Sequence, residues 1–378
     1  MKRLMALWLA VCCMGGMALA EGFPEQLDMS GLAEPAALET AFTPGCESCG
    51  KAACYWETPM DPMDEEAVWA MLTAPITVLE GDTRLQVKLR AAPDEDSAAI
   101  GEITRGSQGV HVLAHLENGW SRVECYSSSF EGSPTRAWNA LLTGYVKTSM
   151  LKEVQVKQKY GFVVDKLDQR LYIYQEEKLL DVLAVSTGYG TEEKGYNESR
   201  SGEFLLYSLS GAFPSENLTC NYGIRYNAGD LLHEVPHIKQ ERGDNYGYTE
   251  PYLGQRASHG CIRVQRKRTE KGINMRWIWN ALYDGQVNSR MVIWEDWQGR
   301  RIPEPAADTP LYYNPQGGEN YHDSPTCYGV KDRYEPMTAF TWGELETAPY
   351  DELDACPYCV PPRRAREIAQ INAEHMPE

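Results

Sequence analysis

The sequence predicts a multidomain protein built mainly from β-strands, and three observations lead to this fold class. At 378 residues the chain has room for about two to four domains. Short runs with strand-like alternation fill residues 76–152 and 158–296, whereas helical periodicity is confined to brief stretches. A Pro-rich segment near residue 300 then precedes a tail that contains Cys and His. We therefore expect a small β-rich domain, a larger β-rich domain with one short helix, and a small C-terminal domain whose Cys and His can bind a metal.

Residues 1–20 have the pattern of a secretory signal peptide. Lys2 and Arg3 form a basic start, an apolar run follows, and a small-x-small site ends at Ala20. We expect cleavage after Ala20 and therefore an exported protein. A lipid anchor through Cys12 or Cys13 is the alternative, although the residue before them fits a lipidation site poorly. No later stretch reaches about 18 apolar residues, so the sequence predicts no membrane span.

Residues 21–75 are expected to form a leader. Its first part, 21–45, is rich in Pro, Ala and Glu and has no sustained period. Cys46, Cys49 and Cys54 follow and leave three alternatives open: a metal knuckle, disulfides, or a shared metal site completed from elsewhere in the chain. Residues 64–72 read as a short helix with acidic residues in its first turn.

The formal charge of −18 argues against nucleic acid or an anionic membrane as a partner. Loss of Lys2 and Arg3 with the signal peptide makes the mature chain still more acidic. Of the 11 cysteines, the two in the signal peptide are removed, which leaves an odd number in an exported chain. At least one thiol would then stay unpaired, and Cys261 is the natural candidate. The pairing of Cys125 and Cys220 is left open.

Residues 76–152 alternate short strand patterns with turn signals. The runs are 85–90, 101–103, 110–113, 119–123 and 144–147. The Leu-Arg-Ala-Ala-Pro segment at 89–93, the Asn-Gly-Trp-Ser-Arg-Val segment at 118–123 and the Gly-Tyr-Val segment at 144–146 resemble the bacterial SH3-like barrel, a wall-associated module. That resemblance implies that Trp120 and Tyr145 line a groove for wall peptide. The alternative, which we favour for Trp120, is that these rings fill the barrel.

Residues 158–296 are expected to form the larger β-rich domain. Strand patterns cover 160–165, 170–174, 179–188 and 201–207, with Gly188 and Gly202 in adjoining turns. A helix is expected across 275–283, followed by a strand at 291–294. A helix that follows a nucleophile can help to lower its pKa.

The chemistry of this region is expected at residues 258–263, which read Ser-His-Gly-Cys-Ile-Arg, together with His233 in a His-Glu-Val-Pro run. A free thiol with a pKa of about 8.5 is only slightly ionised at neutral pH. An imidazole within hydrogen-bond reach can take its proton, and Gly260 lets the backbone bend so that N–H groups face a developing oxyanion. His237 is a second candidate for the base, because it shares a strand face with His233 if the strand continues.

These residues resemble the signature of the L,D-transpeptidases (YkuD-type domain), which cross-link bacterial peptidoglycan. The resemblance implies a mixed β-sandwich fold for residues 158–296. It also implies that Cys261 is the nucleophile and His233 its base, with His259 and Gly260 completing the catalytic group. It further implies that Ser258 and Arg263 shape the site and hold a substrate carboxylate, an alternative for Arg263 being a buried ion pair.

The sequence departs from this pattern in two places. His233 and Cys261 are unusually far apart, and the extra residues 239–251 are interpreted as an enlarged loop over the cleft. Glu234 also stands where the family often has Ser.

The resemblance implies a secreted, monomeric cell-wall enzyme that forms 3–3 cross-links through a thioacyl-enzyme on stem peptides and needs no cofactor for catalysis. One alternative is an L,D-carboxypeptidase that trims the same bond with water. A second is a non-catalytic wall-binding protein. A third is a metallohydrolase that uses His233, His237 and His259.

The end of the chain is expected to hold a linker at 297–310, a metal-binding domain at 311–362 and a tail at 363–378. His322, Cys327, Cys356 and Cys359 offer four soft ligands of the kind that Zn²⁺ takes in tetrahedral sites. The stretch resembles the small metal-binding fold of Ada-type repair proteins, which implies a structural zinc ion. Disulfides, with the histidine on the surface, are the alternative.

Overall fold

The computed structural model describes residues 37–38, 61–294, 301–327 and 329–374. The predicted signal peptide and the Cys46, Cys49 and Cys54 cluster lie outside these residues. The described part is mainly β, with three α-helices among its residues: α1 (Glu65–Thr73), α2 (Met275–Tyr283) and α3 (Ala365–Glu374). No helix in this part of the chain is both long and apolar enough to cross a membrane.

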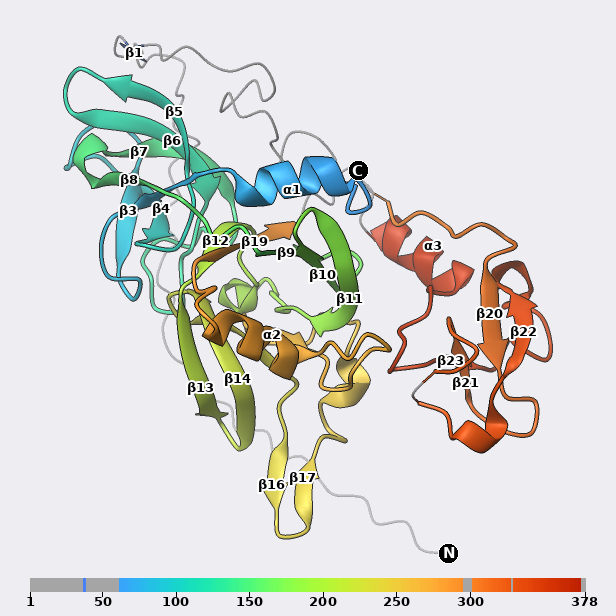
Figure 1. Ribbon diagram of the computed structural model, residues 1–378. Helices are drawn as coiled ribbons and strands as arrows, with labels where there is room; N and C mark the ends of the chain where they lie inside the picture. The colour runs from blue at the N-terminus through green and yellow to red at the C-terminus, as the bar shows by residue number, and fades with distance from the viewer. Residues whose placement is uncertain (1–36, 39–60, 295–300, 328, 375–378) are drawn as a thin grey trace, which may run out of the picture. The chain divides into compact units, whose positions relative to one another are not determined.

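A nine-stranded sheet forms the largest part of the structure (Figure 1). Its strands, in spatial order, are β12 (Gly202–Leu206), β19 (Ser289–Trp294), β9 (Tyr160–Asp165), β10 (Arg170–Gln175), β11 (Lys178–Ser186), β18 (Ile262–Val264), β15 (Asp230–Glu234), β14 (Leu218–Asn227) and β13 (Ser208–Ser215). The pairs β19/β9 and β15/β18 are parallel, and the remaining neighbours are antiparallel.

Helices pack on both faces of this sheet, which explains why β9, β12, β15 and β19 are buried along their whole length. On one face Met275, Ile278 and Leu282 of α2 join the main apolar core. On the other, α1 packs against β9, β10 and β19. Both helices begin with side-chain caps, because Asp64 accepts a hydrogen bond from the Ala67 N–H and Asn274 accepts one from the Trp277 N–H.

The N-terminal β-domain contains a six-stranded sheet and a separate two-stranded pair. The sheet has the order β1 (Ala37–Leu38), β5 (His111–Leu116), β6 (Trp120–Tyr126), β7 (Leu141–Lys147), β3 (Gln86–Arg90) and β4 (Ala99–Thr104), and β2 (Ile76–Leu79) pairs with β8 (Leu151–Val154). Trp120 and Tyr145 are half-buried, and neither belongs to the apolar core of this domain. The interpretation of Trp120 as a barrel-filling residue is therefore not supported.

A buried charge cluster joins this domain to the edge of the large sheet. Glu203 on β12 and Arg290 on β19 form an ion pair with both side chains almost fully buried. His111 Nε2 lies 3.1 Å from the Glu203 carboxylate, and Arg290 also donates to the carbonyls of Met71 and Ala74 at the end of α1. The backbone of residues 107–109 hydrogen-bonds along β12, so the edge strand is covered.

The predicted enlarged loop contains a small hairpin, β16 (Ile238–Gln240) and β17 (Gly243–Asn245), followed by a 3-10 turn at Glu250–Tyr252. The C-terminal part forms a four-stranded sheet in the order β22 (Thr338–Thr341), β20 (Pro310–Tyr313), β21 (Asn320–His322) and β23 (Asp354–Ala355), with α3 beside its core. Further 3-10 turns cover Thr148–Met150, Gly195–Asn197, Asp332–Tyr334 and Trp342–Glu344.

Replacing Glu203 with alanine is expected to lower the free energy of unfolding by about 3–5 kcal/mol, because the buried Arg290 guanidinium then loses its carboxylate partner. Urea unfolding of the purified proteins measures the difference. Glu153→Ala is the matched control, since Glu153 is exposed and its loss should change stability by no more than about 0.5 kcal/mol. Equal, small effects for the two variants would contradict the prediction.

Candidate active site

Two neighbouring parallel strands place the predicted nucleophile and base on the same face of the large sheet. Leu232 pairs with Ile262 and His233 with Arg263, so Leu231 stands opposite Cys261 one step earlier. Because side chains alternate along a strand, Leu232 and Ile262 point into the α2 core, and His233 points to the opposite face with Cys261. Between the described residues no hydrogen bond joins the thiol to the imidazole in this arrangement.

The His233 ring is fixed in the orientation that a base requires. Its Nδ1 lies 2.7 Å from the carbonyl oxygen of Glu234, so Nδ1 carries the proton and donates it. The lone pair is therefore on Nε2. Phe213 packs edge-on against the ring at 5.4 Å between centroids. Since only the Glu234 carbonyl holds the ring, the side chain at this position is free for other contacts, namely with Asn221 and Tyr246.

Burial keeps both reacting groups neutral near pH 7. It lowers the pKa of His233 to about 4, against a smaller opposing effect of the Glu234 carbonyl. Burial, with a further contribution from the Asp230 carboxylate, raises the pKa of the Cys261 thiol to about 12, although the residue itself is only partly buried. The pKa-lowering effect expected from a following helix is not observed, because α2 begins only at Met275. Cys261 and His233 are thus a neutral thiol and a neutral imidazole, and an attack by the thiol would require proton transfer at the same time.

The loop before Cys261 is a closed turn. Ser258 is buried, donates its hydroxyl proton to the Cys261 carbonyl and accepts a hydrogen bond from the Gly260 N–H at 3.3 Å. Its hydroxyl therefore serves the loop itself and not, in this structure, the substrate. His259 is exposed, so the packing expected for it beside the nucleophile is not seen.

Gly260 is required by its surroundings. Its φ of +119° is strained for other residues, and a Cβ there would lie 2.7 Å from Asp230 Oδ1.

A cleft of about 530 Å³ opens beside Arg263 on the same face. Its walls come from the turn between β13 and β14, from the enlarged loop and from the segment before the motif: Asn217, Leu218, Ile238, Tyr248, Thr249, Tyr252 and Ala257. Tyr248 and Tyr252 are largely exposed there. Within the described part of the chain Arg263 has no carboxylate partner, so its guanidinium is available to a ligand in the cleft. The buried ion pair considered for Arg263 is therefore not found.

His237 lies three residues beyond the end of β15 at Glu234 and forms an isolated antiparallel bridge with Thr219 of β14. Its ring lies 3.3 Å from Asp244 and packs on Tyr246. The only metal-compatible group found among the described residues contains none of His233, His237 and His259. The metallohydrolase alternative thus lacks a ligand set.

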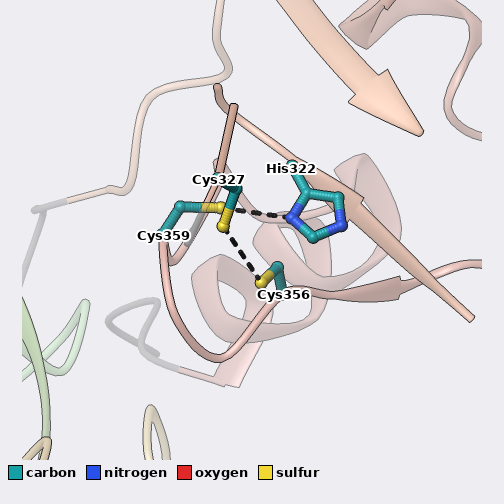
Figure 2. Close-up of side chains that lie close together, drawn as sticks. All are labelled: His322, Cys327, Cys356 and Cys359. Atoms are coloured by element: carbon teal, nitrogen blue, oxygen red, sulfur yellow. Dashed lines mark hydrogen bonds between the residues drawn. The ribbon is translucent and has the colours of Figure 1, made fainter. Parts of the chain in front are cut away.

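That metal-compatible group is the predicted one in the C-terminal part. The ligand atoms of His322, Cys327, Cys356 and Cys359 all lie within 4.8 Å of one another, and Figure 2 shows the side chains turned toward each other. The sulfurs of Cys327 and Cys356 are 3.8 Å apart, and Cys359 Sγ is 3.7 Å from His322 Nδ1. Sulfurs on a tetrahedral ion with Zn–S bonds of about 2.3 Å would be separated by about 3.8 Å.

The alternative with disulfides is not found here. All six described cysteines are free, including Cys125 and Cys220, and the 3.8 Å between Cys327 and Cys356 far exceeds an S–S bond of about 2.05 Å. Backbone N–H groups of Gly329 and Tyr358 point to the sulfurs of Cys327 and Cys356 at 3.4 Å. The donor set and its spacing therefore fit Zn²⁺.

Comparison with known proteins identifies one region of the chain. Residues 159–293 match the family model of the YkuD L,D-transpeptidase catalytic domain. No curated protein matches the sequence. This part of the chain therefore matches an L,D-transpeptidase-type catalytic domain.

Solved structures of L,D-transpeptidases resemble the chain only partly. One from Xylanimonas cellulosilytica DSM 15894 has 19% identity and a TM-score of 0.25, over 36% of this chain and 60% of that one. One from Mycobacterium smegmatis has 12% identity and a TM-score of 0.28, over 59% and 91%. One from Mycobacterium tuberculosis H37Rv has 14% identity and a TM-score of 0.28, over 62% and 86%. The chain thus spans less than two thirds of the first of these structures.

The free energy of unfolding of wild-type protein is expected to fall between pH 6.5 and pH 4. A His233→Asn variant should not show this fall. Folding lowers the pKa of His233 from 6.5 to about 4, so as the pH falls the unfolded chain takes up the proton first. The loss starts as the pH passes 6.5, ends near pH 4 and amounts to about 3 kcal/mol, at about 1.36 kcal/mol per pKa unit. Urea unfolding across this range measures it, and parallel curves for the two proteins would refute the burial of a neutral imidazole.

Proposed function

We propose that this protein is a secreted cysteine L,D-transpeptidase that cross-links peptidoglycan stem peptides. The observation that carries the proposal is the placement of Cys261 and His233 on one face of adjacent parallel strands, inside the region that matches the catalytic-domain family. Arg263, beside them in the cleft, supplies the cation for a substrate carboxylate.

The proposed reaction uses only side chains and backbone groups of this chain. His233 Nε2 takes the thiol proton as Cys261 Sγ attacks the carbonyl carbon of the amide between the third stem residue and the terminal D-Ala. The tetrahedral oxyanion collapses, the C–N bond breaks, and the imidazolium returns the proton to the departing D-Ala amine. An amine of a second stem then attacks the thioester carbon and gives a proton to His233. The C–S bond breaks, the 3–3 cross-link is formed, and the imidazolium returns the proton to the Cys261 thiolate.

Two other outcomes at the same site remain distinct proposals. If water replaces the acceptor amine, the product is a trimmed monomer and the protein acts as an L,D-carboxypeptidase. If Cys261 is inert, the protein is a wall-binding protein whose N-terminal SH3-like domain provides the affinity. The enlarged loop and its two flanking residues favour the enzyme, because Thr249 of the loop lines the cleft next to Arg263 together with Ile238 and Tyr252. These residues form a wall for an extended peptide.

For the C-terminal part we propose a structural zinc site. Three thiolates and one imidazole close the tetrahedron and leave no open position for a substrate. His322, Cys327, Cys356 and Cys359 would hold the ion, which would fix the loops around the small four-stranded sheet.

Incubation with a carbapenem is expected to add the mass of the intact drug to wild-type protein, because the thiol attacks the lactam carbonyl as it would attack the stem amide. Mass spectrometry with peptide mapping locates the adduct on Cys261, and Cys261→Ala should carry none. His233→Gln should slow the addition about 10²–10⁴-fold. An unmodified wild-type protein, or an adduct that persists in Cys261→Ala, would defeat the proposal. Purified protein on stem tetrapeptides then separates cross-linking (dimers) from trimming (tripeptide monomers).

Purified protein is expected to contain about one zinc ion per chain by elemental analysis, and Cys359→Ser should lose most of it because a three-ligand site binds far more weakly. Cys125→Ala is the control, since Cys125 is a buried free cysteine of the N-terminal β-domain. Removal of zinc should increase proteolysis of residues 301–374 without abolishing the carbapenem adduct. Zinc-free wild-type protein isolated from zinc-containing medium would contradict a metal site.

A further inference from the structure

Two buried hydroxyl groups hold the peptide bond between Gly260 and Cys261 by its carbonyl oxygen. Ser199 donates its hydroxyl proton to the Gly260 carbonyl at 2.6 Å. Tyr226 donates to the same oxygen at 3.4 Å. Ser199 and Tyr226 are both completely buried. The carbonyl of Gly260 therefore points into the protein.

The direction of the Ser199 hydroxyl is fixed by its second partner. The Gly188 N–H donates to the Ser199 oxygen at 2.7 Å, so the hydroxyl hydrogen is left for Gly260. Only glycine fits at position 188, because a Cβ there would lie 2.1 Å from the Asn197 carbonyl oxygen. Its neighbour Thr187 accepts hydrogen bonds from the N–H groups of Ala257 and Ser258. The end of β11 thus holds both Ser199 and the start of the motif loop.

The orientation of this carbonyl determines the orientation of the next amide. In a trans peptide the C=O and the following N–H point in opposite directions. With the Gly260 oxygen held inward, the Cys261 N–H points outward, to the side where a substrate carbonyl meets the thiol. The Gly260 N–H is already used by Ser258. The Cys261 N–H is therefore the backbone donor of this loop that remains for an oxyanion.

A buried ion pair prevents the peptide from turning over. Arg200 donates to Asp230 at 3.2 Å and to the carbonyl of Ser129 at 2.6 Å, and its guanidinium stacks on the Phe130 ring at 4.0 Å. Asp230 Oδ1 and Arg200 Nη1 would lie 2.7 and 3.3 Å from a Cβ on Gly260. These groups pack against the α-carbon of Gly260 and leave little room for a peptide flip.

We propose that Ser199 is a positioning residue for thioacylation and that Tyr226 supports it. Ser199 keeps the Cys261 N–H directed at the oxyanion and touches neither the thiol nor the substrate. This inference rests on the proposed function of Cys261. Loss of an oxyanion donor lowers the rate of acyl transfer about 10²–10³-fold in enzymes. In these variants the Cys261 N–H is still present and only its orientation is no longer fixed. We therefore expect the acylation rate to fall about 10–100-fold for Ser199→Ala and about 3–10-fold for Tyr226→Phe.

Two reactions of the same thiol test the proposal. Acylation by a carbapenem passes through an oxyanion, whereas alkylation by iodoacetamide is a displacement at carbon that develops none. Both rates are measured at pH 8.5 by mass spectrometry of Cys261. For Ser199→Ala we expect slower acylation and an alkylation rate within about twofold of wild type. Ser289→Ala and Tyr174→Phe are the controls, because each removes a buried hydroxyl hydrogen bond elsewhere in the same sheet.

Each outcome has a separate meaning. Equal losses in both reactions would place the effect of Ser199 on the thiol or on folding and overturn the proposal, as would unchanged acylation. If Ser199→Ala does not fold, the ratio of the acylation rate to the alkylation rate is measured in Tyr226→Phe instead. A lower ratio than in wild type supports the proposal, and an unchanged ratio overturns it. If wild-type protein is alkylated but never acylated, the proposed function of Cys261 itself fails.

Discussion

The buried carboxylate of Glu203 is the constraint on which the assembly of the described chain most depends. A charge without water is stable only when it is paired and hydrogen-bonded, and its partners come from separate places in the sequence. Arg290 ties it to β19 and to the end of α1, and His111 ties it to the N-terminal β-domain. Because β12 is an edge strand of the nine-stranded sheet, this cluster holds the N-terminal β-domain against that edge.

The candidate active site also depends on residues that are distant in the sequence. Cys261 receives its geometry from β11, from Ser199 and from Arg200, and Arg200 is in turn anchored by a carbonyl of the N-terminal β-domain. That domain is therefore joined to the loop of the nucleophile through one guanidinium. The sequence suggests separate domains, but in the structure the N-terminal β-domain contacts the loop that holds Cys261 through Arg200.

Local patterns predicted the elements that local physics determines. The strand expected at 160–165 and the helix expected at 275–283 have the same bounds in the structure, because alternation and an Asn N-cap are contained in a few neighbouring residues. The long hairpin β13–β14 was missed, since bulges at Leu209, Gly211 and Phe213 break its alternation. The supporting residues of the site were missed for another reason: Ser199 meets Gly260 across 61 positions, and no spacing rule marks such a contact. The Cys and His group of the C-terminal part was predicted because its two halves, His322 with Cys327 and Cys356 with Cys359, are each short local patterns.

A thiol whose proton is retained by burial has a consequence outside the reaction itself. Oxidants and stray disulfides attack the thiolate. If the protein is exported, as we propose, it meets both without the reducing systems of the cytosol. The burial that raises the pKa of Cys261 would then also protect its sulfur from oxidation until a substrate reaches it.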